Sequence, residues 1–102
     1  MKLIDIAHAR SGDKGNICNI AVFAYDSSRF ALLAKHLTAD RVRRHFGSMV
    51  CGKVERFDLP PLGALNFVLH DALDGGVNQS LALDTHGKCF ASILLEIELP
   101  DI

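Results

Sequence analysis

The chain has 102 residues, a size that fits one domain with a modest hydrophobic core. Its net charge of −1, with both signs mixed along the sequence, lacks the basic footprint of nucleic-acid binding and the polybasic patch of membrane binding. No run approaches the ~20 apolar residues of a membrane span, and the apolar start, broken at Asp5, is too short for a signal peptide. The three cysteines are far apart and form no CxxC pair, which predicts a reduced, cytoplasmic protein.

Hydrophobic residues make up 49% of the chain, at the upper side of ordinary usage. Two explanations stay open: a well-packed core, or a second apolar surface for a partner or for self-association. On the second explanation, we expect a homo-oligomer whenever the chain is without another partner.

The first half predicts strands followed by helices. Residues 2–9 predict a strand, 8–16 a polar loop, and 17–25 a second strand whose apolar run indicates cover on both faces. Residues 26–28 are helix-capping types before a helix that contains Phe30, Leu33 and Leu37 at helical spacing. Thr38 is expected to cap a second helix that ends at Gly47.

The second half predicts one more strand, one helix and a hairpin. Residues 52–59 predict a strand that ends at Pro60, followed by a helix with Leu62, Leu65, Leu69 and Leu73 on one face. The remainder predicts a strand over 79–84, a turn over 84–88 and a long last strand through 99. This mixture predicts a single α+β domain over 1–102, a two-layer sandwich with helices on one face of a mainly antiparallel sheet.

The segment "HARSGDKGN", residues 8–16, is the first candidate site. Gly12 and Gly15 allow a close approach to backbone N–H groups, and Arg10 and Lys14 add positive charge, a combination that suits an anion. The alternative is a tight turn in which aspartate and asparagine side chains cap their own backbone. The four letters "GDKG" also match the GxxG of KH domains, but a KH loop joins two helices. Nucleic-acid binding is therefore a distant alternative.

The second candidate segment is "LGALNFVLHDALDGG". Asn66 lies within the leucine face of the predicted helix, and His70 follows one turn later. A buried amide needs a partner, which we expect to be the 8–16 loop. The histidines show no HxH or HxxxH spacing, so a metal site made of His8, Asp13 and His70 is a weak alternative, and we expect neither a metal nor another cofactor.

The segments "DIAHARSGDKGNICNIAVFA", "LTADRVRRHFG" and "LPPLGALNFVLHDALDGGVNQSLALDTHGK" together resemble the small AtuA-like domain, named for acyclic terpene utilisation in bacteria. The resemblance covers nearly the whole chain and implies a ferredoxin-like fold. Such domains occur as the C-terminal part of a larger protein or as a separate chain, and this sequence resembles the separate form. The motif positions that carry over as ligand-binding candidates, none of them assigned a catalytic role, are His8, Arg10, Ser11, Gly12, Asp13, Lys14, Gly15, Asn16, Asn66 and His70.

The resemblance also implies a function, because larger AtuA-like proteins are linked to catabolism of citronellol, geraniol and related branched acyl-CoA compounds. We expect a small subunit that docks on a large AtuA-like chain and contributes the 8–16 loop to a site for an acyl-CoA or similar anionic metabolite. The alternative is a stand-alone homo-oligomeric enzyme or ligand-binding domain. The sequence leaves open whether the chain is itself an enzyme.

Overall fold

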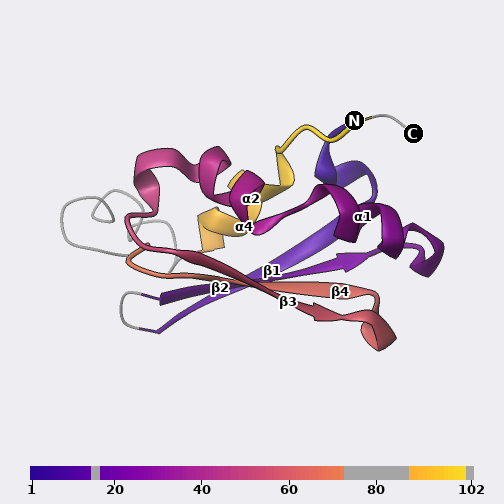
Figure 1. Ribbon diagram of the computed structural model, residues 1–102, viewed down its shortest axis with the longest axis horizontal. Coiled ribbons are helices and arrows are strands. Elements are labelled where there is room, and N and C mark those ends of the chain that lie inside the picture. The colour runs from indigo at the N-terminus through magenta and orange to yellow at the C-terminus, as the bar shows by residue number, and fades with distance from the viewer. Residues whose placement is uncertain (15–16, 73–87, 101–102) are drawn as a thin grey trace.

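The computed structural model describes residues 1–14, 17–72 and 88–100. Its four-stranded antiparallel sheet has the order β1-β2-β4-β3. The strands are β1 (Ala7–Lys14), β2 (Ile17–Ala24), β3 (Val54–Leu59) and β4 (Ala64–Leu69). The helices α1 (Phe30–His36), α2 (Ala39–Phe46) and α4 (Lys88–Leu95) lie on one side of this sheet (Figure 1). The predicted α+β sandwich with helices on one face is confirmed.

The helix starts follow the capping residues that the sequence predicts. A carboxylate oxygen of Asp26 accepts a hydrogen bond of 3.0 Å from the backbone N–H of Ser28, at the 3₁₀ turn that leads into α1. The Thr38 hydroxyl accepts one of 3.1 Å from the backbone N–H of Arg41. Gly47 follows α2 with a φ of 59°, a conformation that costs glycine little. These caps satisfy N–H groups that a helix start otherwise leaves unpaired.

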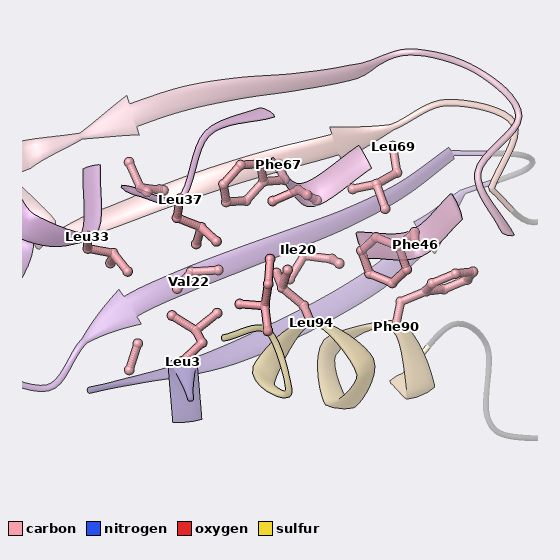
Figure 2. Close-up of a cluster of buried hydrophobic side chains, with 14 of the residues drawn as sticks. Leu3, Ile20, Val22, Leu33, Leu37, Phe46, Phe67, Leu69, Phe90 and Leu94 are labelled. Atoms are coloured by element: carbon pink, nitrogen blue, oxygen red, sulfur yellow. The ribbon is translucent and has the colours of Figure 1, made fainter. Parts of the chain in front are cut away.

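The core lies between the helices and one face of the sheet (Figure 2). Along β2 and β4 every second residue points into it, because side chains alternate across a strand. The rings of Phe46 on α2 and Phe90 on α4 meet edge to face, with centroids 5.4 Å apart. The largest fully buried side chains include Phe67, Phe90, Leu3, Ile20, Leu33, Leu37, Leu65, Leu69 and Leu94.

The predicted first strand starts too early. Leu3–Asp5 is a 3₁₀ turn, and β1 begins only at Ala7. In a strand over residues 2–9, Ile4 would share one face with Ile6 and His8. In the structure Ile4 is instead 44% exposed on this turn. The backbone N–H of Leu3 donates to Ile97 O at 2.9 Å, so this turn is held by the C-terminal segment rather than by a neighbouring strand.

The prediction that β2 is covered on both faces is wrong. Cys18, Ile20 and Val22 are buried, but Asn19 is exposed and Phe23 is only half-buried. The reason is that, within residues 1–14, 17–72 and 88–100, the helices lie on a single face of the sheet (Figure 1). Apolar residues on the other face are therefore surface residues of the described structure.

The predicted helix after Pro60 is also wrong, although two leucines of its apolar face, Leu65 and Leu69, are buried. A 3₁₀ turn (Pro60–Leu62) ends at Gly63, whose φ is 61°, and the chain then returns as β4. A spacing of four residues fits both one helix face and one strand face, so the leucines alone do not distinguish the two. The segment forms a strand because its backbone pairs with β2 on one side and with β3 on the other.

The long last strand is wrong as well, because Lys88–Leu95 forms helix α4. Phe90 and Leu94 are its fully buried residues, four apart on the face toward the sheet. After the helix, the N–H of Leu99 donates to Met1 O at 2.7 Å, which ties the end of the described chain to its start. The predicted strand over 79–84 and nearly all of the turn after it lie outside the described residues.

Candidate functional site

The candidate site is the sheet face that the helices leave uncovered, which we call the open face. Its residues, read across the sheet in register, form rows. One row runs His8, Phe23, Ala64 and Leu59; the next runs Arg10, Ala21, Asn66 and Phe57; the third runs Gly12, Asn19, Val68 and Glu55.

Aromatic rings gather at one end of the open face. The His8 ring stacks on Phe23, with centroids 5.1 Å apart and 14° between the planes, and on Tyr25 at 5.6 Å and 26°. Tyr25 is 61% exposed and Phe57 is 49% exposed, and the large side chains of Leu59 and Leu62 are exposed beside them. Aromatic and aliphatic side chains of this size are normally withdrawn from water, so this end of the face has the composition of a contact surface.

A histidine–glutamate pair lies at the opposite end of the open face. Nε2 of His70 lies 2.7 Å from Oε1 of Glu55, and the Lys53 ammonium lies 4.0 Å from the same oxygen. The hydrogen bond from His70 is the main cause that lowers the pKa of Glu55, because it favours the ionised carboxylate. The backbone N–H of His70 donates to Lys53 O at 3.0 Å, which fixes this corner of the sheet.

The predicted 8–16 loop is mostly a strand. Residues 8–14 belong to β1 and pair with β2 as far as Lys14 opposite Ile17, because the polar segment still has backbone groups that a hairpin partner satisfies. Alternation turns His8, Arg10 and Gly12 to the open face, while Ser11 turns toward α4. The backbones of Asp13 and Lys14 lie further along β1, and Gly15 and Asn16 lie outside the described residues.

A groove runs along the edge of the sheet where β1 meets α4. Its volume is about 330 Å³. It places one guanidinium and two hydroxyl side chains among small and apolar ones, a mixture that suits a polar head group with a short apolar part. The lining residues are Ala9, Arg10, Ser11, Ala91, Ser92 and Leu95.

The structure brings together only part of the predicted site. Asn66 does not lie on a helix; it lies on β4, in the row of Arg10, with the small Ala21 between them. His70 directly follows β4 and contacts Glu55 rather than the predicted loop. His8 and His70 sit six residues apart along the register, roughly 20 Å at the rise of a strand, so the metal site that would combine them is not formed. Within 1–14, 17–72 and 88–100 no group of three metal-ligating side chains is assembled.

Sequence reasoning missed the apolar part of this site: Tyr25, Phe57, Leu59 and Leu62. The signal was present in "VERFDLPPL", where Glu55, Phe57 and Leu59 alternate with Arg56 and Asp58. A one-sided strand pattern there predicts a face with two large apolar residues. Whether that face points to solvent or to the core depends on where the helices pack, and the sequence pattern does not predict this.

The fold and the open face define a small α+β sandwich domain with an uncovered sheet surface. The sequence matches the family model of the AtuA ferredoxin-like domain over residues 1–100. The chain therefore belongs to the AtuA ferredoxin-like domain family, as its resemblance implied. No curated protein and no solved structure matches the sequence significantly. Among the helices of the described residues, none is long and apolar enough to cross a membrane.

Proposed function

We propose that this chain is the small subunit of a cytoplasmic AtuA-like complex and docks on the large AtuA-like chain through its open face. The complex would serve bacterial catabolism of acyclic terpenes or branched acyl-CoA compounds, as the family membership suggests. The observation that carries the docking proposal is the exposure of Tyr25, Phe57, Leu59 and Leu62 at one end of this face.

The composition of the open face supports a protein partner. Interface cores are enriched in aromatic side chains, and a few such residues dominate the binding energy. Here Tyr25 and Phe57 occupy the apolar end, while Arg10, Asn66 and the Glu55–His70 pair supply polar contacts around it. A Cβ built on Gly12 meets no described atom within 4 Å, so a partner can approach the backbone at this position.

The docking proposal predicts that Phe57→Ser abolishes or strongly weakens capture of the large chain. Phe57 lies in the middle of edge strand β3 and is half-exposed, so its loss removes contact area without emptying the core. Truncating a central aromatic anchor costs about 2 kcal/mol or more of binding free energy, or about thirtyfold in affinity. The measurement is co-purification of tagged small chain with the large chain, followed by calorimetry.

Ile4→Ser is the matched control, because Ile4 is 44% exposed but lies on the 3₁₀ turn before β1, away from the open face. Equal affinity of the Phe57→Ser and parent proteins would contradict docking through this face. If the parent instead forms a stable homo-oligomer that Phe57→Ser dissociates and that excludes the large chain, the stand-alone alternative replaces the small-subunit proposal.

We further propose that the groove between β1 and α4 holds the anionic group of an acyl-CoA or similar metabolite. Arg10 lines this groove and also belongs to the open face, so one side chain would connect the docked partner and the ligand. Ser11 and Ser92 place hydroxyl groups in the same groove. Along β1, Lys14 adds a second basic residue to the strand.

Arg10→Gln should therefore weaken binding of an acyl-CoA thioester to the assembled complex. A hydrogen bond to a charged group contributes about 1.5–3 kcal/mol, which corresponds to roughly ten- to a hundredfold in affinity. The folded state should persist, since Arg10 is exposed. Calorimetric titration checks this result, with Arg29→Gln, an exposed arginine before α1, as the control. Parallel losses in both variants would mean that the effect is general electrostatics and not a site at the groove.

A further inference from the structure

We propose that a hollow between α2 and the segment after α4 binds the phosphate group of a small soluble phosphate monoester. The hollow has a volume of about 330 Å³ and is lined by Arg41, Arg44, His45 and Ile97. It is separate from the open face, since it lies on the helix layer, and the proposal does not depend on docking of the large chain.

The helix itself places the three basic side chains together. Arg41, Arg44 and His45 are spaced i, i+3 and i+4 along α2, which puts them on one side of the helix. Val42 and Phe46 are buried toward the sheet and fix how α2 is rotated. The basic side is therefore held in one orientation by the core.

Two of the three side chains are held in place by main-chain carbonyls. Nη1 of Arg41 donates to the Glu98 carbonyl at 3.1 Å, and Nε2 of His45 lies 2.7 Å from the Ile93 carbonyl. Main-chain carbonyls position these side chains but carry no net charge, so the arginine keeps its positive charge facing the hollow. This arrangement lowers the conformational entropy that a ligand would otherwise have to offset.

The two carboxylates that flank Ile97 in the sequence form ion pairs with groups outside the hollow. Glu96 pairs with the Lys2 ammonium at 2.7 Å, and Glu98 pairs with the N-terminal amine of Met1 at 3.2 Å. Among the described residues, the ion pair at the hollow is that of Arg44 Nε with Asp40, at 3.0 Å. Positive charge is thus concentrated on α2 within a chain whose net charge is −1.

A phosphate monoester dianion fits this arrangement. Guanidinium groups bind phosphate oxygens through paired N–H groups, which gives both charge and geometric match. An alternative explanation for the basic residues is the helix dipole, which favours positive charge in the last turn of a helix. The dipole alone does not explain the hollow or the hydrogen bonds from the basic side chains to main-chain carbonyls. Anchored arginine and histidine side chains around a space large enough for phosphate indicate a ligand.

The proposal is tested by titrating the full chain with inorganic phosphate and with glycerol phosphate at constant ionic strength, followed by amide NMR shifts. We expect saturable shifts centred on α2 and residues 96–98. Arg44→Gln should weaken binding about tenfold or more, because it removes one charged donor pair. Arg44 is 72% exposed, so this variant should fold normally. Asp40→Asn should strengthen binding, because it removes the carboxylate that competes for Arg44.

Arg29→Gln is the control for net charge, and we expect less than a twofold change from it. No saturation by either phosphate, or equal weakening by Arg29→Gln and Arg44→Gln, would overturn the proposal. Co-sedimentation with phosphatidic-acid vesicles in the absence of binding to glycerol phosphate would also overturn it, since the ligand would then be a membrane surface.

Discussion

Phe67→Ala should lower the free energy of unfolding by about 3–5 kcal/mol, the usual cost of truncating a buried phenylalanine. Phe67 is fully buried in the middle of β4, between Ile20 of β2 and Arg56 of β3 in the sheet register. The loss combines removed apolar burial with a cavity that the surrounding strands and helices fill only partly. Since small domains are stable by about 5–15 kcal/mol, urea denaturation should detect the change easily.

Phe57→Ala is the matched control for this prediction. It deletes the same side chain from the adjacent strand, one residue position away in register, but Phe57 points to the open face and is 49% exposed. We expect a cost of about 1 kcal/mol or less, because no cavity forms. Equal destabilisation by the two substitutions would show that the alternation along β3 and β4, and hence the identity of the open face, is wrong.

Arg56→Gln is expected to destabilise the fold by about 2 kcal/mol, although it replaces a charged residue on an edge strand. Nη1 of Arg56 donates to the carbonyls of Ala34 and Leu37, at 2.6 and 3.1 Å, at the end of α1. Its Nε and Nη2 contact the two carboxylate oxygens of Asp58, at 2.8 and 3.1 Å. Helix ends leave carbonyls unpaired, and a partly buried carbonyl that loses its donor costs free energy.

Arg44→Gln provides the comparison, because the Arg44–Asp40 pair is 72% and 75% exposed. Exposed pairs of this kind contribute about 0.5 kcal/mol or less. Arg56→Lys should restore only part of the lost stability, since a lysine ammonium does not reproduce the fork that reaches both carbonyls and the carboxylate. Urea midpoints that are the same for Arg56→Gln and Arg44→Gln would mean that Arg56 does not hold α1 to the sheet.

Arg56 and Asp58 point to the helix side of the sheet, opposite to Phe57. These two charged residues make β3 a suitable edge strand. Charged residues on an edge discourage pairing with strands of other molecules. This leaves the open face, rather than the β3 edge, as the surface that we propose for the large chain. The β3 edge carries charged side chains that oppose strand pairing, whereas the open face carries large apolar side chains that suit a partner.

Elements with local signals were predictable from the amino-acid pattern. Asp26 and Thr38 marked the helix starts, Gly47 marked the end of α2, and the apolar run over 17–25 predicted β2. The caps and the glycine act within a few residues of the chain, so they can be recognised without knowledge of distant contacts. The unbroken apolar run indicates a strand before its pairing partners are known. The motifs in "HARSGDKG" and "LGALNFVLH" were sufficient for the family, because they are long and specific.

Elements whose patterns fit two conformations depended on contacts with distant segments. Leu65 and Leu69, four residues apart, suit a helix or a strand, and the hydrogen bonds that β2 and β3 offer on both sides made this segment β4. Ile93 and Leu95 alternate as in a strand, yet burial of Phe90 and Leu94 against the sheet accompanies helix α4. The same tertiary arrangement placed all helices of the described chain on one face and so exposed Tyr25 and Phe57 on the other. Burial depends on which elements pack together, and packing is set by contacts between segments far apart in the chain.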